Sequence, residues 1–316
     1  MKVGIIGIGD ICKKAYLPLI TLMDDLEIVL CTRNTTTLQE TKSKYKINKA
    51  VSSVDDLINE GIECAFIHSS TDSHYDLCKK LLSSGIHVYV DKPISYNLDQ
   101  ALELKDLAIK NNLILKVGFN RRFAPMISSL KNLGEANIVL IQKNRVNLPG
   151  QPRIFVYDDF IHVVDTLRFL MNGAYDNFTV DARIEDNLLQ SITLKLSNSK
   201  TTPIGIMNRI NGITEEIVEY MAPGKKAIVR NLTHTTLLEN NSTSIKEFGD
   251  WENTLNKRGF NSIISSFIDD VKTKNLNYDM LEDSIITHKL CEKILKERGC
   301  IKINLIQSDK KKEENS

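Results

Sequence analysis

The chain has 316 residues, of which 42% are hydrophobic and 26% are charged, a composition typical of a globular protein long enough for two domains. Its 41 basic and 40 acidic residues leave a net charge of +1, which argues against a nucleic-acid-binding protein that depends on surplus positive charge. We expect a cytoplasmic protein, because no apolar stretch reaches membrane-spanning length and no leader precedes the first predicted strand.

The first predicted strand, residues 2–7, is apolar as in a parallel sheet covered on both faces, and it runs into Gly7-Ile8-Gly9. These glycines fit the first two positions of a dinucleotide-binding turn, and Cys12 fits the third. A helix over 10–22 would then hold a pyrophosphate at its N-terminus. A G-x-G turn alone is weak evidence, but its position at the first strand–helix junction favours nucleotide binding over an ordinary glycine turn. The predicted cofactor contacts here are Gly7, Gly9, Asp10 and Ile11.

The second predicted strand, 27–31, ends in Thr32-Arg33-Asn34. An NAD site usually places an acidic residue here, and none is present. A hydroxyl followed by a guanidinium suits a 2′-phosphate, so Thr32 and Arg33 favour NADP(H), with NAD(H) as the alternative. The competing interpretation is that Arg33 is a solvated loop residue and contacts no cofactor.

Strands and helices continue to alternate, which predicts an α/β fold with a doubly wound parallel sheet. The predicted elements are a helix over 52–59, strands over 64–68, 87–90 and 113–118, and helices over 73–84 and 97–111. Small polar residues follow the third strand, and we expect Ser70, Thr71 and His74 to line the cofactor. The six cysteines include no C-x-x-C pair, which favours buried free thiols over disulfides or a zinc site.

Asp91-Lys92-Pro93 stands where the fourth predicted strand ends, because proline cannot continue a central strand. The carboxyl ends of parallel strands border the ligand crevice of an open α/β sheet. We therefore expect Lys92 to contact both cofactor and substrate, and Asp91 to fix the lysine beside the cofactor.

The G-x-G turn, the acid-Lys-Pro tripeptide and Gly-Phe-Asn-Arg-Arg-Phe at 118–123 together resemble the Gfo/Idh/MocA oxidoreductases, a family that includes glucose–fructose oxidoreductase and inositol dehydrogenase. The usual tripeptide of the family is Glu-Lys-Pro, so Asp91 is a shortened replacement. The resemblance implies a Rossmann domain followed by an α+β domain with an open, mostly antiparallel sheet. We place these domains at 1–120 and 121–307, and expect the charged residues 308–316 to form a disordered tail.

Residues 157–168 are predicted to form a helix with Asp158 and His162 on one face and Asp165 three residues further on. Family members that this segment resembles carry Asp-x-Gly-x-His-x-x-Asp, and the resemblance implies that the first aspartate and the histidine meet the substrate. Phe160 replaces the usual glycine and is expected to crowd that wall. The alternative is an amphipathic helix with His162 packed in a core.

Short alternating segments from 177 to 246 predict strands of one sheet, and helices follow near 254–273 and 279–298. The predicted strands are 136–146, 178–184, 188–196, 203–209, 216–221 and 226–231. The resemblance implies that this sheet makes the contact of a homodimer or homotetramer.

These features predict hydride transfer between a nicotinamide and a secondary alcohol or carbonyl of a sugar, cyclitol or sugar derivative. His162 is the expected general acid/base, Asp158 would orient it or bind a hydroxyl, and Lys92 would stabilise the reacting oxygen. Asn120 and Arg121 are further substrate candidates, whereas Arg122 is a weaker one. Which of Lys92 and His162 transfers the proton stays open. The alternatives are a net redox-neutral lyase or glycosidase that oxidises its substrate transiently, and a non-enzymatic nucleotide-binding regulator.

Overall fold

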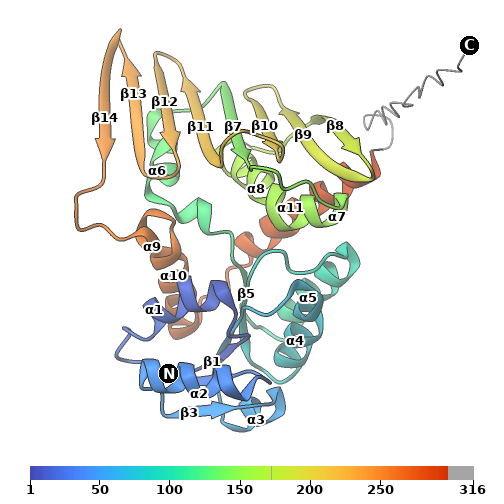
Figure 1. Cartoon of the computed structure of the whole chain (residues 1–316), viewed down its shortest axis with the longest axis vertical. Helices are drawn as coiled ribbons and strands as arrows, with labels where there is room; N and C mark the ends of the chain where they lie inside the picture. The colour runs from blue at the N-terminus through green and yellow to red at the C-terminus, as the bar shows by residue number, and fades with distance from the viewer. Residues whose placement is uncertain (172, 298–316) are drawn as a thin grey trace, which may run out of the picture.

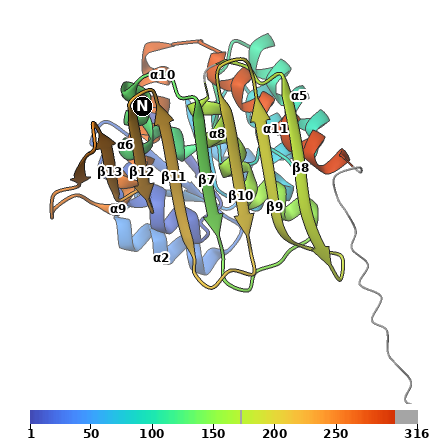
Figure 2. The same ribbon diagram turned by 90° about the horizontal axis from the view of Figure 1, so that it is seen from above.

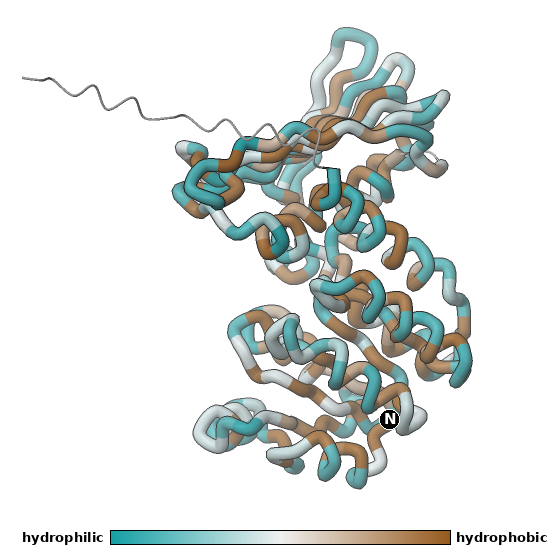
Figure 3. The backbone as a smooth tube through the Cα atoms, turned by 90° about the vertical axis from the view of Figure 1, so that its right-hand side faces the viewer, coloured by the Kyte–Doolittle hydropathy of each residue, from teal (hydrophilic) through white to brown (hydrophobic). Residues whose placement is uncertain are grey.

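The computed structural model describes residues 1–171 and 173–297, which form two β-sheets connected by layers of helices (Figure 1). The predicted tail at 308–316 and Cys300 lie outside the described residues. Buried and partly exposed residues alternate along strands of the second sheet, as in β10 (Thr202–Asn208), and Figure 3 shows hydrophobic and hydrophilic residues interspersed along the chain in colour.

The N-terminal sheet is fully parallel, with the strand order β3-β2-β1-β4-β5-β6, and confirms the predicted doubly wound fold. Side chains of β1 alternate between two cores, with Val3 and Ile5 on one face and Ile6 on the other. The strands are β1 (Lys2–Ile6), β2 (Glu27–Cys31), β3 (Lys49–Val51), β4 (Cys64–Ile67), β5 (His87–Val90) and β6 (Leu115–Val117). The helices between them are α2 (Thr35–Tyr45), α3 (Val54–Asn59), α4 (Thr71–Ser83) and α5 (Leu98–Lys110).

Two elements of this half were not predicted, α2 and β3. The helix buries only Leu38 and Thr41, so it lacks an apolar stripe, and the strand has three residues, none fully buried. Asp91-Lys92-Pro93 therefore follows the fifth strand of the chain rather than the fourth, although it still lies at a carboxyl end.

The first helix begins near Asp10 as predicted but ends at Ile20 instead of residue 22. It contains a π-helical turn, η1 (Cys12–Tyr16), followed by α1 (Leu17–Ile20). Cys12 and Tyr16 are buried against the sheet, which agrees with a small residue at the third position of the glycine turn.

The second sheet has the order β14-β13-β12-β11-β7-β10-β9-β8 and is antiparallel except where β7 pairs with β10. Figure 2 shows its strands side by side, with α8 (Ile161–Leu170) and α11 (Asp279–Lys296) behind one face. The remaining strands are β7 (Ile138–Asn144), β8 (Asn177–Glu185), β9 (Leu188–Ser197), β11 (Glu215–Ala222), β12 (Lys225–Arg230), β13 (His234–Glu239) and β14 (Ser242–Glu247). This mostly antiparallel sheet was predicted.

Short helical segments lead into and out of this sheet. They are η2 (Asn120–Phe123), α6 (Pro125–Ser128) and η3 (Ser129–Leu133) before β7, and α7 (Pro152–Ile154) and η4 (Phe155–Phe160) before α8. The π-helical turn η4 continues directly into α8, so the predicted helix over 157–168 is interrupted by a change of helical pitch.

The predicted helix over 254–273 is two helices, α9 (Thr254–Lys257) and α10 (Phe260–Thr273), separated by Gly259 at φ +80°. After the second sheet, α10 returns to the N-terminal sheet, where Ile263 and Phe267 join one of its two cores. The domain limits at 1–120 and 121–307 stay a prediction. The helix α10, which belongs to the second predicted domain by sequence, packs against the sheet of the first.

The described cysteines, Cys12, Cys31, Cys64, Cys78 and Cys291, are buried free thiols, as predicted. Across residues 1–171 and 173–297, the structure contains no helix long and apolar enough to span a membrane.

Gly259 gives a direct test of the turn between α9 and α10. A Cβ at this position would lie 2.4 Å from the backbone oxygen of Asn120 and 2.5 Å from the amide nitrogen of Ala124. We expect Gly259→Ala to lower the free energy of unfolding by more than the ~1–3 kcal/mol of left-handed backbone strain alone. Gly224→Ala is the matched control, since Gly224 has φ +75° but open space around it. Urea unfolding of both variants checks this, and equal losses would contradict the close packing.

Candidate active site

A cavity of about 1230 Å³ lies between the carboxyl end of the N-terminal sheet and the second sheet. Its walls come from η1, the loops after β4 and β5, η2, the η4–α8 segment, the ends of β7 and β10, and the α9–α10 turn. The predicted site residues that line it are Ile11, Ser70, Thr71, His74, Asp91, Lys92, Asn120, Arg121, Asp158 and His162. The chain thus brings residues from both predicted domains to one cavity.

The glycine turn after β1 has the shape that a dinucleotide pyrophosphate requires. Gly7 has φ +83°, and a Cβ there would lie 2.4 Å from the amide nitrogen of Ser69, so only glycine fits. At Gly9 the nearest atom to such a Cβ is the carbonyl oxygen of His68 at 4.0 Å, which leaves room for a close ligand. A helix begins directly after this turn, with Asp10 and Ile11 as its first residues, and the amides of a helix N-terminus favour an anion. These residues fit a nicotinamide dinucleotide.

Thr32 and Arg33 follow β2 and do not line the cavity. The Arg33 side chain is exposed, and within the part of the chain that the structure describes it makes no ion pair or hydrogen bond. Asn34 beside it caps α2 by accepting a hydrogen bond from the Thr37 amide at 2.9 Å. The guanidinium of Arg33 is therefore available at the end of the strand where a ribose would lie.

Asp91 does not hold Lys92, contrary to the prediction. Its carboxylate accepts a hydrogen bond from the Tyr16 hydroxyl at 2.6 Å and contacts Nδ1 of His68 at 2.9 Å. The rings of Tyr16 and His68 stack with centroids 3.8 Å apart. Although burial opposes its charge, His68 and Tyr16 hold the pKa of the Asp91 carboxyl below its ordinary value.

This arrangement gives a physical reason for aspartate in place of glutamate. Tyr16 is almost fully buried and its hydroxyl also lies 2.9 Å from that of Tyr89. A Cβ at Gly118 would stand 2.9 Å from the Tyr89 hydroxyl and 3.2 Å from the Asp91 carboxylate. The space beside residue 91 is therefore filled by two tyrosines and an imidazole, and the shorter acid fits it.

Lys92 spans the cavity to the other half of the molecule. Its ammonium donates to the backbone carbonyl of Asp158, at the start of the predicted catalytic segment. Burial lowers the pKa of Lys92, although Asp158, Asp159 and Asp91 lie near enough to oppose this shift. The cation is thus held at the junction of β5 and η4, with its remaining N–H donors free of a described partner.

The loop after Lys92 is fixed by His288 of α11. The Ile94 amide donates to Nε2 of His288 at 3.1 Å, and Nδ1 of the same ring lies 2.8 Å from the backbone oxygen of Ser284. A nitrogen that accepts and a nitrogen that donates require the neutral imidazole. Burial lowers the pKa of His288 to about 4, which agrees with this tautomer.

Asp158 and His162 both line the cavity, but no hydrogen bond joins them among the described residues. Both carboxylate oxygens of Asp158 accept from the Tyr96 hydroxyl at 2.8 Å. Nδ1 of His162 is buried without a described partner. Burial lowers the pKa of His162 well below its ordinary value, and the charges of Arg121 and Lys92 add to the shift, so the ring is neutral at neutral pH.

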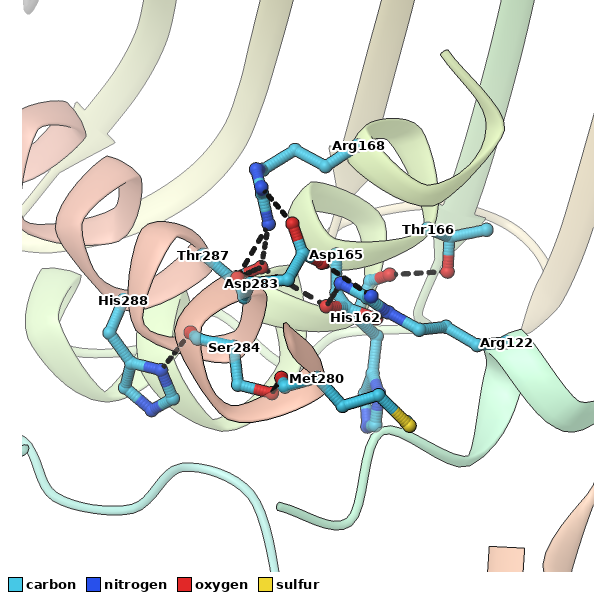
Figure 4. A network of polar contacts seen from close by, with 10 residues as sticks. All are labelled: Arg122, His162, Asp165, Thr166, Arg168, Met280, Asp283, Ser284, Thr287 and His288. Carbon is cyan, nitrogen blue, oxygen red and sulfur yellow. Dashed lines mark hydrogen bonds and ion pairs between the residues drawn. The ribbon is translucent and has the colours of Figure 1, made fainter. Parts of the chain in front are cut away.

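Neither Phe160, which was expected to crowd the wall of the site, nor Asp165 lines the cavity. Phe160 is fully buried in the hydrophobic core and does not line the cavity. Asp165 accepts from Arg122 at 2.8 Å and from Thr287 at 3.1 Å. Figure 4 shows this network of Arg122, Asp165, Arg168 and Asp283, with the His162 ring pointing away from it. The π-helical turn before α8 changes the angular relation between Asp158 and the later residues, which the regular spacing assumed.

Arg122 and Arg121 have different surroundings. Arg122 forms ion pairs with Asp165 of α8 and Asp283 of α11 and so connects these two helices. It was the weaker of the two arginine candidates for substrate binding. Arg121 lines the cavity, and its guanidinium donates to the Glu216 carboxylate at 2.6 and 2.9 Å. Asn120 also lines the cavity, while its side-chain amide donates to the backbone oxygen of Arg258 at 2.8 Å.

Several cavity residues were not found from the sequence. Tyr16 and Tyr96 supply hydroxyls to Asp91 and Asp158, and Arg145, Asp159 and Arg209 form much of the wall near His162. One signal was available, because Lys143 and Arg145 are two residues apart on the predicted strand 136–146, a spacing that places both side chains on one face. The partners of Tyr16 and Tyr96 depend on contacts between residues more than 60 positions apart, which no local pattern carries.

Two family profiles match the sequence. Residues 1–119 match the family described as "Oxidoreductase family, NAD-binding Rossmann fold", known as Gfo/Idh/MocA, and residues 125–240 match the C-terminal domain of YceM-like proteins.

Two of the matching proteins cover almost the whole chain, and a third covers somewhat more than half of it. YceM of Salmonella typhimurium, provisionally named an oxidoreductase, is 33% identical over 92% of this chain and 96% of its own. The crystal structure of the dehydrogenase MviM from Clostridium difficile is 35% identical, with a TM-score of 0.88 over 94% of this chain and 99% of that chain. Myo-inositol 2-dehydrogenase of Thermotoga maritima is 26% identical over 58% of this chain and 59% of its own.

The neutral His288 makes folding stability depend on pH. Its pKa is about 4 in the folded protein and about 6.5 when unfolded, so the unfolded chain binds the extra proton between these values. The neutral His288 therefore contributes to the free energy of unfolding above pH 6.5, and this contribution, on the order of 3 kcal/mol, is lost as the pH falls toward 4. We expect the free energy of unfolding of His288→Gln, measured with urea from pH 7 to pH 4, to fall less steeply with pH than that of the parent protein. Protonation of carboxylates also lowers the stability of both proteins as the pH falls. Parallel curves of unfolding free energy against pH would therefore contradict the role of His288.

Proposed function

The chain belongs to the Gfo/Idh/MocA family of NAD-binding oxidoreductases, and from this premise we propose that it transfers a hydride between a nicotinamide and a secondary alcohol or carbonyl of a sugar, cyclitol or sugar derivative. The observation that carries the proposal is the meeting of Lys92, Asp158 and His162 in one cavity above a glycine turn that fits a dinucleotide. A relative named myo-inositol 2-dehydrogenase supports the substrate class.

The nicotinamide, when bound, supplies the hydride acceptor or donor, and the protein must hold the substrate and manage one proton. In the oxidation direction, Lys92 donates a hydrogen bond to the substrate oxygen and stabilises the negative charge that develops there. His162 accepts the hydroxyl proton, because a neutral imidazole can act as a base. Burial keeps its ring unprotonated, so the imidazole has a free lone pair that can accept the proton, whereas a protonated lysine has none.

Asp158 and Tyr96 form a second polar contact point in the cavity. The tyrosine hydroxyl donates to the carboxylate, so the carboxylate retains acceptor sites for a substrate hydroxyl. Its backbone carbonyl meanwhile holds the Lys92 ammonium. We assign Asp158 to substrate binding, with Tyr96 as its positioning residue.

Arg33 supports NADP(H) as the preferred cofactor. It is exposed at the carboxyl end of β2, beside Thr32, and no acidic side chain follows that strand directly. A free guanidinium binds a 2′-phosphate through paired hydrogen bonds, whereas NAD(H) offers only hydroxyls there.

The proposed reaction can be distinguished from a net redox-neutral one by the absorbance of the reduced nicotinamide. A dehydrogenase changes the absorbance at 340 nm in proportion to the substrate consumed, whereas an enzyme that oxidises its substrate only transiently leaves it unchanged. A regulator that merely binds the nucleotide would need none of Lys92, Asp158 and His162, so loss of turnover on their replacement also separates that alternative.

Lys92→Met tests the proposed stabilisation of the reacting oxygen. We expect kcat to fall by about 100-fold or more, because a preorganised donor to an oxyanion contributes at least that much. Binding of the reduced nicotinamide, followed by its fluorescence, should stay within about threefold of the parent value. Lys80→Met, at a half-exposed lysine of α4, is the matched control and should turn over normally. Near-normal kcat in Lys92→Met would refute the assignment.

Arg33→Ser tests the cofactor preference. The loss of a charged hydrogen bond to phosphate should raise KM for NADP(H) by roughly tenfold or more. KM for NAD(H) should change by less than about twofold, because its ribose carries no phosphate. Lys44→Ser, near the far end of α2, serves as the charge-matched control. A parent protein that prefers NAD(H), or equal effects on both cofactors, would overturn the preference.

A further inference from the structure

A cluster of cations surrounds one carboxylate on the wall that the second sheet contributes to the cavity. Asp159 accepts hydrogen bonds from Lys143, from Arg145 at 3.0 and 3.3 Å, and from Arg209 at 3.0 Å. We call these four residues the Asp159 cluster. Arg145 and Arg209 follow β7 and β10, which pair in parallel, so both arginines emerge at the same edge of the sheet.

The cluster carries more positive than negative charge. Three basic side chains share the single carboxylate of Asp159, and the neighbouring Arg121 is already paired with Glu216. Burial and the charge of Arg121 lower the pKa of Lys143 to about 7, so a part of this excess is removed at neutral pH. The two arginines stay protonated, and an excess positive charge therefore remains.

Both arginines retain donors that face no protein acceptor. Arg145 lines the cavity with its side chain 31% exposed, and its Nη1 makes no hydrogen bond to any described residue. Arg209 is 9% exposed and lies over the Phe155 ring at 4.3 Å, and its Nε is buried with no partner in the described chain. A buried guanidinium N–H without an acceptor is costly unless a ligand supplies one.

The cluster lies beside the groups assigned to the reaction. Asp159 follows Asp158, whose backbone carbonyl holds Lys92, and the charges of Lys143 and Arg145 contribute to the lowered pKa of His162. The pyrophosphate turn at Gly7–Gly9 belongs instead to the N-terminal sheet. The surplus charge thus faces the substrate end of the cavity rather than the turn that receives the cofactor phosphates.

We propose that the substrate carries an anionic group, a carboxylate or a phosphate, which Arg145 and Arg209 bind while its carbinol carbon lies between Lys92 and His162. This inference rests on the proposed function and narrows its substrate class from sugars and cyclitols in general to their acids and phosphate esters. Arg145 provides the accessible donors, and Arg209 provides a rigid one supported by Phe155. The bound anion balances the excess charge of the Asp159 cluster.

Matched pairs of compounds test the charge requirement. D-glucuronate is compared with D-glucose, D-galacturonate with D-galactose, and an inositol monophosphate with myo-inositol, each with NAD and NADP at 340 nm. Binding of the same compounds to the protein with its reduced cofactor is measured by calorimetry, so that the comparison does not depend on turnover. We expect at least one anionic member to exceed its neutral partner about tenfold or more in affinity or kcat/KM. Its advantage should shrink as NaCl is raised, because salt screens the attraction.

Arg145→Met identifies the residue responsible. Lys143 and Arg209 still neutralise Asp159 in this variant, so the protein should fold, which its circular dichroism and melting temperature check. We expect affinity for the preferred anionic compound to fall about tenfold or more, with neutral partners changed by less than about twofold. Arg145→Lys should restore part of the loss, since it keeps the charge but not the fork of donors. Arg183→Met removes an exposed arginine of β8 and is the matched control.

The inference is overturned if no anionic compound surpasses its neutral partner, or if Arg145→Met weakens both members of a pair equally. Turnover of neutral sugars with loss on Lys92→Met would then leave the proposed function standing. Anion-selective binding that depends on Arg145, without a net change at 340 nm for any compound, would instead support the anion site and contradict the proposed dehydrogenation.

Discussion

The contact between the Lys92 ammonium and the backbone carbonyl of Asp158 is the constraint on which the site depends. It joins the carboxyl end of β5 to the π-helical turn that precedes α8, so one lysine connects the N-terminal sheet to the helical segment beside the second sheet. The loop behind it is held by the His288 imidazole, and the acid before it by Tyr16 and His68. Each neighbour of Lys92 is thus anchored to a different element, which leaves the lysine a narrow range of positions.

Buried ion pairs connect segments that lie far apart in the chain. Arg122 bridges Asp165 of α8 and Asp283 of α11, Arg121 reaches Glu216 of β11, and Lys116 of β6 reaches Asp270 of α10. Such pairs cost desolvation energy and contribute little net stability, but leaving one partner unpaired is strongly unfavourable. They therefore select one relative placement of the two sheets. The Asp159 cluster differs from these balanced pairs, because its cations outnumber its carboxylate.

Local rules predicted the parts of the molecule that local physics determines. The glycine turn, the strand that ends just before Asp91-Lys92-Pro93 and the alternating strands of the second sheet were all predictable, because periodicity and turn chemistry act within a few residues. The partners of Asp91, Tyr96 and Asp159 were not, because they come from elements that only the tertiary fold brings together. The i, i+4 spacing of Asp158 and His162 left open whether the carboxylate orients the imidazole or binds a hydroxyl. After the π-helical turn, the carboxylate accepts from the Tyr96 hydroxyl, and no hydrogen bond to His162 is described. Short or weakly amphipathic elements, β3 and α2, were missed for lack of an apolar pattern.

The return of α10 to the N-terminal sheet has a consequence for the order in which the protein is made. A ribosome releases β1 to β6 first, and an N-terminal domain generally folds as it emerges. Here Val3, Ile5 and Phe66 of the first sheet share a core with residues of α10, namely Ile263, Ile264 and Phe267. The ribosome adds these α10 residues nearly 200 positions after Phe66. One face of the first sheet therefore stays incomplete until almost the whole polypeptide has left the ribosome. A chain that ends before α10 would therefore leave this face of the N-terminal sheet uncovered.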